Sequence, residues 1–118
     1  MTAYLLAFNA TRQAPIAAKV EKADTPAARS QGLLGRESLA QDEALWIVPC
    51  PMIHTFFMRF PIDVLFLDRD LRVRRVIENL PPWRLSPWVW AARSALELKG
   101  GVLGGSVRVG DSLEMRPA

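Results

Sequence analysis

Short apolar runs separated by turn-forming residues recur along the whole chain. The first two cover residues 4–8 and 16–21, with polar residues and a proline between them. Runs of this length, bounded by turn residues and lacking a helical period, are typical of β-strands. We therefore predict that the chain begins with two strands joined by a turn.

Later runs of the same kind indicate a strand-rich domain. The segments 63–67 and 72–77 flank the polar tripeptide Asp68-Arg69-Asp70 and form the clearest predicted hairpin. Residues 81–90 hold three prolines and three tryptophans, which predicts a loop rather than an inner strand. The glycine-rich segment 100–105 predicts turns. The remaining predicted strands cover residues 45–48, 55–59, 95–98 and 112–115.

One segment carries the signals of a helix. Asp24 and Thr25 are capping residues, and Pro26 follows in the first turn, where its missing N–H has no hydrogen bond to lose. We predict a helix over residues 27–34 that stops at Gly35, because glycine readily adopts the left-handed conformation found at helix ends.

These elements predict a mainly β (α+β) fold. Many short strands with one helix indicate a small barrel or folded sheet with the helix packed on it. Helices do not alternate with strands, so an open α/β sheet is not expected. The 118 residues, half of them hydrophobic, are enough for one domain that spans residues 1–118.

Composition and charge narrow the setting of this domain. The net charge of +3 permits an anionic partner without requiring one. Cys50 is the one cysteine, so no internal disulfide can form, and its apolar neighbours predict a buried thiol. The N-terminal segment has no basic start, and no uncharged run reaches the roughly 20 residues of a membrane-spanning helix. We therefore predict a cytoplasmic protein without a membrane span.

Three segments carry a family resemblance. Residues 28–36 read A-R-S-Q-G-L-L-G-R, residues 54–64 read H-T-F-F-M-R-F-P-I-D-V, and Leu96-Glu97-Leu98 precedes Gly104 and Val109-Gly110-Asp111. In order and spacing they resemble the motifs of an uncharacterised family, domain-of-unknown-function family 192, over about residues 20–115. The resemblance implies a small, mostly β fold with no established activity.

Two features depart from the family pattern. Many relatives carry an export or lipoprotein signal, which we do not expect here. Phe57 stands where the pattern has a small residue, often glycine. A ring at this position would narrow a pocket beside His54.

His54, the one histidine, is the first candidate for chemistry. Histidine titrates near neutral pH, and Asp63 or Glu97 could orient it if the strands that carry them converge. The alternatives are a ligand contact and a histidine that is hydrogen-bonded within the sheet. No catalytic triad is recognisable, and we predict no catalytic residue, no metal site and no cofactor.

Arg29 and Arg36 are the second candidate pair. They are seven residues apart, which is two helical turns, and so share a face if the helix continues. Two guanidinium groups on one face could clamp a carboxylate or a phosphate. Alternatively, Arg29 pairs with Asp63 or Glu97 and holds the helix on the sheet.

The tryptophan loop is the third candidate. One or two of its rings could cover the core, or Trp83 and Trp88 could form a stacking platform for a sugar or a protein partner. The densest basic region, residues 69–84, is typical of a solvated edge, and we do not expect a nucleic-acid surface.

The leading hypothesis for function is a non-enzymatic small-ligand-binding or assembly-accessory domain. The five motif residues would line a shallow cleft with the tryptophan loop at its rim: Arg29, Arg36, His54, Asp63 and Glu97. The partner would be a small molecule or a protein. Family members without a signal suggest an accessory to an envelope or pilus-type system, acting from the cytoplasmic side.

Two alternatives belong to other classes of function. One is a hydrolase that uses His54 with Asp63 or Glu97. The other is a protein-interaction module that uses the loop with Trp83 and Trp88.

Overall fold

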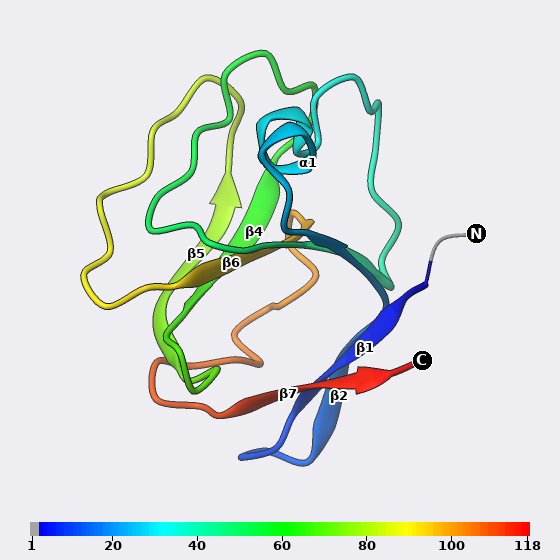
Figure 1. Cartoon of the computed structure of the whole chain (residues 1–118), viewed down its shortest axis with the longest axis vertical. Coiled ribbons are helices and arrows are strands. Elements are labelled where there is room, and N and C mark those ends of the chain that lie inside the picture. The colour runs from blue at the N-terminus through cyan, green and yellow to red at the C-terminus, as the bar shows by residue number, and fades with distance from the viewer. Residues whose placement is uncertain (1–2) are drawn as a thin grey trace.

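A computed structural model describes residues 3–118 as one curled β-sheet with a short helix, α1, over Pro26–Gln31 (Figure 1). The strands cross the sheet in the order β5-β4-β6-β3-β2-β1-β7. Neighbouring strands are antiparallel except β2 and β3, which run parallel. The predicted mainly β fold is therefore confirmed. The strands are β1 Leu5–Asn9, β2 Ala14–Ala23, β3 Glu43–Ile47, β4 Ile62–Leu67, β5 Val73–Leu80, β6 Ser94–Lys99 and β7 Leu113–Pro117.

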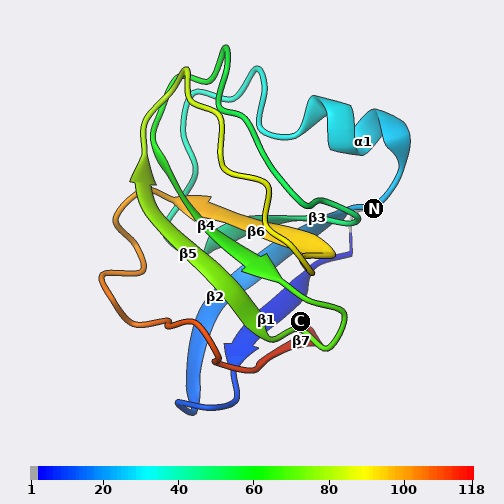
Figure 2. The ribbon, with the colours of Figure 1, turned by 90° about the vertical axis from the view of Figure 1, so that its left-hand side faces the viewer.

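The sheet curls into a half-barrel whose outermost strands approach each other at one end (Figure 2). There Arg72, just before β5, and Ser112, just before β7, form an isolated bridge. The Leu113 N–H donates to the Leu71 carbonyl at 2.9 Å. Only a few residues of the two edges pair in this way, so β5 and β7 do not form a continuous ladder and the barrel stays open.

Asp111 links the segment before β7 to the hairpin of β1 and β2. Its carboxylate accepts hydrogen bonds from Asn9 at 2.9 Å, from Arg12 at 2.8 Å and from the Arg108 N–H at 3.0 Å. Burial by itself would raise the pKa of Asp111, but these hydrogen bonds and the charge of Arg12 lower it below the ordinary value of 3.8.

The two faces of the central strands enter two separate cores. All six residues of β4 are buried. Ile62, Val64 and Phe66 belong to an outer core between the sheet and the helix region. Leu65 and Leu67 belong to an inner core that fills the half-barrel. Because successive strand residues alternate between faces, neighbouring positions in one strand serve different cores.

Helix α1 begins as predicted and ends early. Thr25 caps it, with Oγ1 accepting from the Ala28 N–H at 3.1 Å, and Pro26 occupies the first turn. The predicted extension to residue 34 is wrong, because Gly32 adopts a φ of 48° and turns the chain. This turn carries Leu33 into the outer core.

The predicted strand over residues 55–59 is also wrong, because the segment is a tight turn. The Met58 N–H donates to the Thr55 carbonyl at 3.2 Å, and Phe57 has a φ of 66°. Thr55 and Met58 are buried, whereas the two phenylalanines between them are exposed. Each of the other predicted strands overlaps an observed one, including the hairpin of β4 and β5.

Candidate functional site

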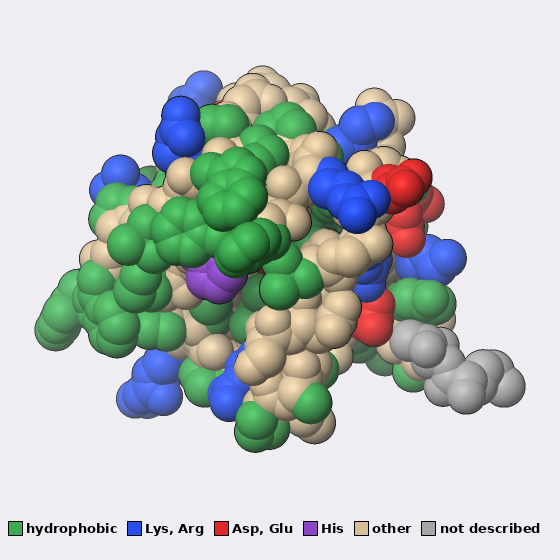
Figure 3. All heavy atoms as spheres, turned by 90° about the horizontal axis from the view of Figure 1, so that it is seen from above, with side chains coloured by type: hydrophobic (Ala, Val, Ile, Leu, Met, Phe, Trp, Pro, Cys, Tyr) green, Lys and Arg blue, Asp and Glu red, His purple; other side chains and the backbone are tan. Residues whose placement is uncertain are grey.

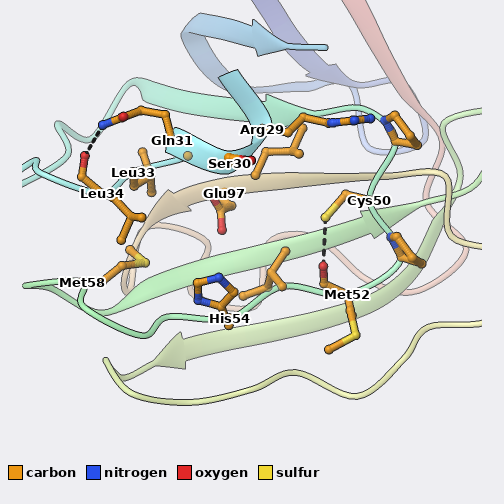
Figure 4. A pocket seen from close by; sticks show the side chains of 15 residues that line it. Arg29, Ser30, Gln31, Leu33, Leu34, Cys50, Met52, His54, Met58 and Glu97 are labelled. Atoms are coloured by element: carbon orange, nitrogen blue, oxygen red, sulfur yellow. Dashed lines mark hydrogen bonds between the residues drawn. The ribbon is translucent and has the colours of Figure 1, made fainter. Parts of the chain in front are cut away.

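A cavity of about 220 Å³ lies beneath α1, on the outer-core side of the sheet (Figure 4). Its walls come from residues 29–34, from most of residues 47–54, from Met58 and from Glu97 of β6. Most of these wall side chains are apolar. Solvent can reach the cavity, because His54 and other wall residues are exposed.

Glu97 is the carboxylate in the wall of this cavity. It pairs in register with Leu45 of β3 and Val64 of β4, so it stands in the middle of the sheet. Its side chain points into the cavity (Figure 4), and the residue is only 3% exposed. No donor among residues 3–118 forms a hydrogen bond or salt bridge with its carboxylate. The wall therefore holds a buried acidic group without a partner.

Burial raises the pKa of Glu97 from its ordinary value of 4.5 to about 7. The ionised form is disfavoured because the residue is almost entirely buried and no protein donor contacts its carboxylate. At 1.36 kcal/mol for each pKa unit, keeping the anion costs about 3 kcal/mol. A molecule that brings a donor or a positive charge to Glu97 would recover part of this free energy.

Arg29 lies in the α1 wall of the same cavity. It forms no salt bridge within residues 3–118, and its guanidinium extends away from Glu97 (Figure 4). The alternative in which Arg29 pairs with Asp63 or Glu97 is therefore wrong. The charge of Arg29 acts instead on the Cys50 thiol, where it opposes the larger pKa-raising effects of burial and of Glu97.

Cys50 is buried, as the sequence predicts, and it also lines the cavity. Its thiol donates to the Met52 carbonyl at 3.0 Å. Burial and then the charge of Glu97 raise the pKa of Cys50 to about 11, against the smaller lowering effects of the Met52 hydrogen bond and of Arg29. The thiol is therefore protonated at neutral pH and is a poor nucleophile.

His54 stands at the exposed edge of the cavity. Its Nδ1 accepts from the Phe56 N–H at 3.3 Å, and its ring stacks on the Phe56 ring with centroids 5.2 Å apart. Among the described residues, no carboxylate is hydrogen-bonded to the imidazole. The histidine–carboxylate pair required by the hydrolase alternative is not formed.

Asp63 lies on the opposite face of the sheet and does not reach the cavity. It pairs in register with Leu98, one residue beyond Glu97, so the two acidic side chains point to different cores. Its carboxylate accepts from the backbone N–H groups of Asn79, Gly101 and Leu103 at 2.8–2.9 Å. The expectation that Asp63 joins the other motif residues is thus corrected: it anchors the glycine-rich turn.

Arg36 is also separated from the cavity. Its Nη2 lies 3.1 Å from Glu21 Oε2, and it lines a neighbouring hollow of about 470 Å³ instead. Because the helix ends at Gln31, Arg36 does not share a helical face with Arg29. The motif residues that meet at one cavity are therefore Arg29, His54 and Glu97.

The tryptophan loop forms an exposed apolar surface next to this cavity. Trp83, Trp88 and Trp90 are 56%, 67% and 85% exposed, so none of these rings covers the core. The Trp83 ring lies 4.7 Å from that of Phe57 and 6.3 Å from that of Phe56. We call this surface the aromatic face; it comprises Phe56, Phe57, Trp83, Leu85, Trp88 and Trp90.

The backbone beneath the aromatic face is strained at three positions. Phe57, Trp83 and Ala91 have positive φ angles of 66°, 64° and 69°. Side chains other than glycine adopt this region at a cost of about 1 kcal/mol each. Backbone hydrogen bonds hold these conformations: the Met58 and Trp83 N–H groups donate to the Thr55 carbonyl at 3.2 and 2.9 Å, and the Ala92 N–H donates to the Val89 carbonyl at 3.1 Å.

Sequence reasoning missed the apolar part of the cavity wall. Leu33, Ile47, Ile53 and Met58 all line it, although they read as ordinary core residues. The one available signal was Glu97 inside an apolar strand, which is the pattern of a buried acid.

No helix within residues 3–118 is both long and apolar enough to cross a membrane. No three His, Cys, Asp or Glu side chains of these residues are grouped closely enough to hold a metal ion.

Comparison with solved structures identifies similar folds. A protein of unknown function from Novosphingobium aromaticivorans DSM 12444 superposes with a TM-score of 0.81 at 23% identity, covering 93% of this chain and 83% of that one. A protein from Sinorhizobium meliloti 1021, provisionally named a transcription regulator, gives 0.78 at 26% identity, covering 98% of this chain and 96% of that one.

No curated protein matches the sequence. The model of the family described as DUF192, Uncharacterized ACR, matches residues 7–115, which include the three motif segments and nearly all of the sheet. The chain therefore belongs to the DUF192 family, as its motifs predict.

Proposed function

We propose that this chain is a small-molecule-binding domain. Its ligand has an apolar body and a head group that donates hydrogen bonds or carries a positive charge. The observation that supports this proposal is the unpartnered carboxylate of Glu97, 3% exposed and pointing into a cavity with mostly apolar walls. An apolar wall with one oriented polar group is typical of small-molecule sites.

The size of the cavity limits the ligand. About 220 Å³ is below the range of roughly 300–1,000 Å³ found for drug-sized ligands. We therefore expect a molecule with on the order of ten non-hydrogen atoms in the cavity. A longer molecule would extend past the exposed edge where His54 lies.

The charged groups around Glu97 determine the preferred head group. The other titratable residues that line the cavity are Arg29, Cys50, whose thiol is protonated, and His54 at the exposed edge. None of these side chains forms a hydrogen bond or salt bridge with the Glu97 carboxylate. An ammonium head group would stabilise the ionised form and displace the proton that Glu97 carries below pH 7. Affinity for an amine should therefore rise between pH 5 and pH 8.

Three probes of one shape test this preference: benzylamine, benzyl alcohol and benzoate. Each is titrated into the protein at pH 7 while NMR signals of cavity residues such as Ile47 and Met58 are followed. Benzylamine should bind most tightly, and Glu97→Gln should weaken it about tenfold by removing one charge pair of modest strength. Glu114→Gln, which changes an exposed carboxylate in β7, should leave the affinity unchanged.

Other results would overturn the proposal. If benzoate binds best, the cavity selects anions and Arg29 rather than Glu97 governs it. If none of the probes perturbs the cavity signals, the cavity is a packing feature. Equal affinity of benzylamine for the wild type and Glu97→Gln would show that the Glu97 carboxylate does not contribute to binding.

The other hypotheses receive less support. An accessory role in an envelope or pilus-type system stays a prediction, since no observation bears on a partner.

The provisional name of the Sinorhizobium structure suggests nucleic-acid binding, but α1 has six residues and is too short for a recognition helix. In the basic β4–β5 hairpin, Arg74 is held by Asp68 at 2.9 Å. The hydrolase alternative lacks its histidine–carboxylate pair.

A further inference from the structure

The exposed apolar side chains of the aromatic face come from two neighbouring, hydrogen-bonded segments, one around residues 51–57 and the other around residues 83–90. Six of the eight large hydrophobic residues that are exposed in the described chain belong to it. Tryptophan and phenylalanine usually bury most of their surface, so such a cluster marks a contact surface. In the view from above, hydrophobic side chains gather beside the histidine and extend to the left edge (Figure 3).

Backbone pairing holds these side chains outward. The Trp83 N–H donates to the Thr55 carbonyl at 2.9 Å, and the Thr55 N–H donates to the Arg84 carbonyl at 2.8 Å. Further along, the Val89 N–H donates to the Pro51 carbonyl at 2.9 Å. The two segments therefore form an irregular ribbon that presents the rings in fixed positions.

The two segments that carry the aromatic face contain basic residues and no acidic ones. Residues 48–61 and 81–96 contain Arg59, Arg84 and Arg93 but no aspartate or glutamate. Arg84 and Arg93 form no salt bridge within residues 3–118, and Arg59 has an exposed contact with a glutamate at 3.4 Å. Most acidic side chains visible in Figure 3 lie at its right-hand side, away from the hydrophobic surface.

We propose that the aromatic face is a docking surface for an anionic lipid bilayer. Tryptophan rings favour the interfacial region of a membrane, and neighbouring arginines are attracted to anionic headgroups. A protein partner would also bury aromatic rings. However, arginines without any intervening acid give the segments the charge complementary to an anionic bilayer. The proposal does not depend on a ligand in the cavity.

Binding to vesicles tests the proposal. The protein is sedimented with sucrose-loaded phosphatidylcholine vesicles that contain either no phosphatidylglycerol or about one third of it. We expect binding to the anionic vesicles, a blue shift of tryptophan emission on binding, and weakening by added salt. Each arginine near the surface should contribute about fivefold to the affinity.

Two pairs of matched variants identify the surface. Trp88→Ala with Trp90→Ala should weaken vesicle binding at least about tenfold, since burying about 60 Å² of apolar surface is worth that much. The control, Tyr4→Ala with Val109→Ala, removes exposed apolar side chains elsewhere and should bind as the wild type does.

For charge, Arg84→Gln with Arg93→Gln should weaken vesicle binding by more than tenfold. Arg69→Gln with Arg108→Gln removes the same net charge from exposed positions outside the two segments and should have a much smaller effect.

Several results would overturn the proposal. A folded wild type that does not sediment with anionic vesicles would do so, and so would a Trp88/Trp90 variant that binds as tightly as the wild type. If the protein instead forms a dimer that the Trp88/Trp90 variant abolishes, and binds no vesicles, the occupant of the face is a second copy of the chain.

Discussion

Replacing Glu97 with glutamine should change the way in which stability depends on pH. In the folded protein, burial raises the pKa of Glu97 from 4.5 to about 7, whereas in the unfolded chain the group is in water and keeps its ordinary value. Between these two values the folded protein binds more protons than the unfolded chain does. The free energy of unfolding of the wild type must therefore decrease as the pH rises through this window.

The size of the effect follows from the two pKa values. At 1.36 kcal/mol per pKa unit, the complete change between pH well below 4.5 and pH well above 7 is about 3 kcal/mol. Most of this change should occur between pH 5 and pH 8, because that range spans the pKa of the folded protein. Glutamine has the same shape and does not titrate, so Glu97→Gln should lack this component.

Urea denaturation at a series of pH values from 5 to 8 measures the difference directly. Other titrating groups are common to both proteins, so subtracting the two curves isolates Glu97. Glu114→Gln serves as the control and should follow the wild-type curve, because its side chain is exposed. If the free energy of unfolding of the wild type changes with pH in parallel with that of Glu97→Gln, the claim that burial raises the pKa of Glu97 is refuted.

Three further predictions concern Asp63, Asp111 and Cys50. Asp63→Ala should lower the free energy of unfolding by about 3 kcal/mol in urea, because three backbone N–H groups lose their acceptor; a loss below about 1 kcal/mol would contradict this. The pKa of Asp111 is lowered, so its stabilisation is present above pH 3.8 and is lost on acidification; Asp111→Asn should flatten the acid limb of a stability–pH curve. With a pKa of about 11, only about one Cys50 thiol in a thousand is ionised at pH 8, so iodoacetamide should react slowly with it and faster in Glu97→Gln. An unchanged alkylation rate in that variant would show that Glu97 does not act on the thiol.

Local patterns were sufficient to predict most of the fold. The hairpin around residues 68–70 and the start of α1 follow from turn and capping residues, whose conformations are set by near neighbours. The strand predicted over residues 55–59 was wrong because the apolar residues of this segment divide between a buried and an exposed set. A hydrophobic run indicates an apolar environment but does not distinguish a core from an exposed contact surface.

The candidate site depends on long-range geometry that a single sequence does not contain. Asp63 and Glu97 are equivalent as residue types, and only the register of β4 with β6 sends them to opposite faces. Likewise, the φ of Gly32 ends the helix and separates Arg29 from Arg36. The sequence therefore supplied suitable candidates, while the fold determines which of them meet.

The most direct test of the central claim is a ¹³C NMR titration of the Glu97 carboxyl, assigned with Glu97→Gln, in the absence and presence of saturating benzylamine. We predict that the carboxyl titrates near pH 7 in the free protein and that benzylamine lowers its pKa, because the ammonium group favours the ionised form. A pKa near 4.5 in the free protein, or one that benzylamine does not change, would contradict the proposal that Glu97 is an unsatisfied acid that receives the head group of a ligand.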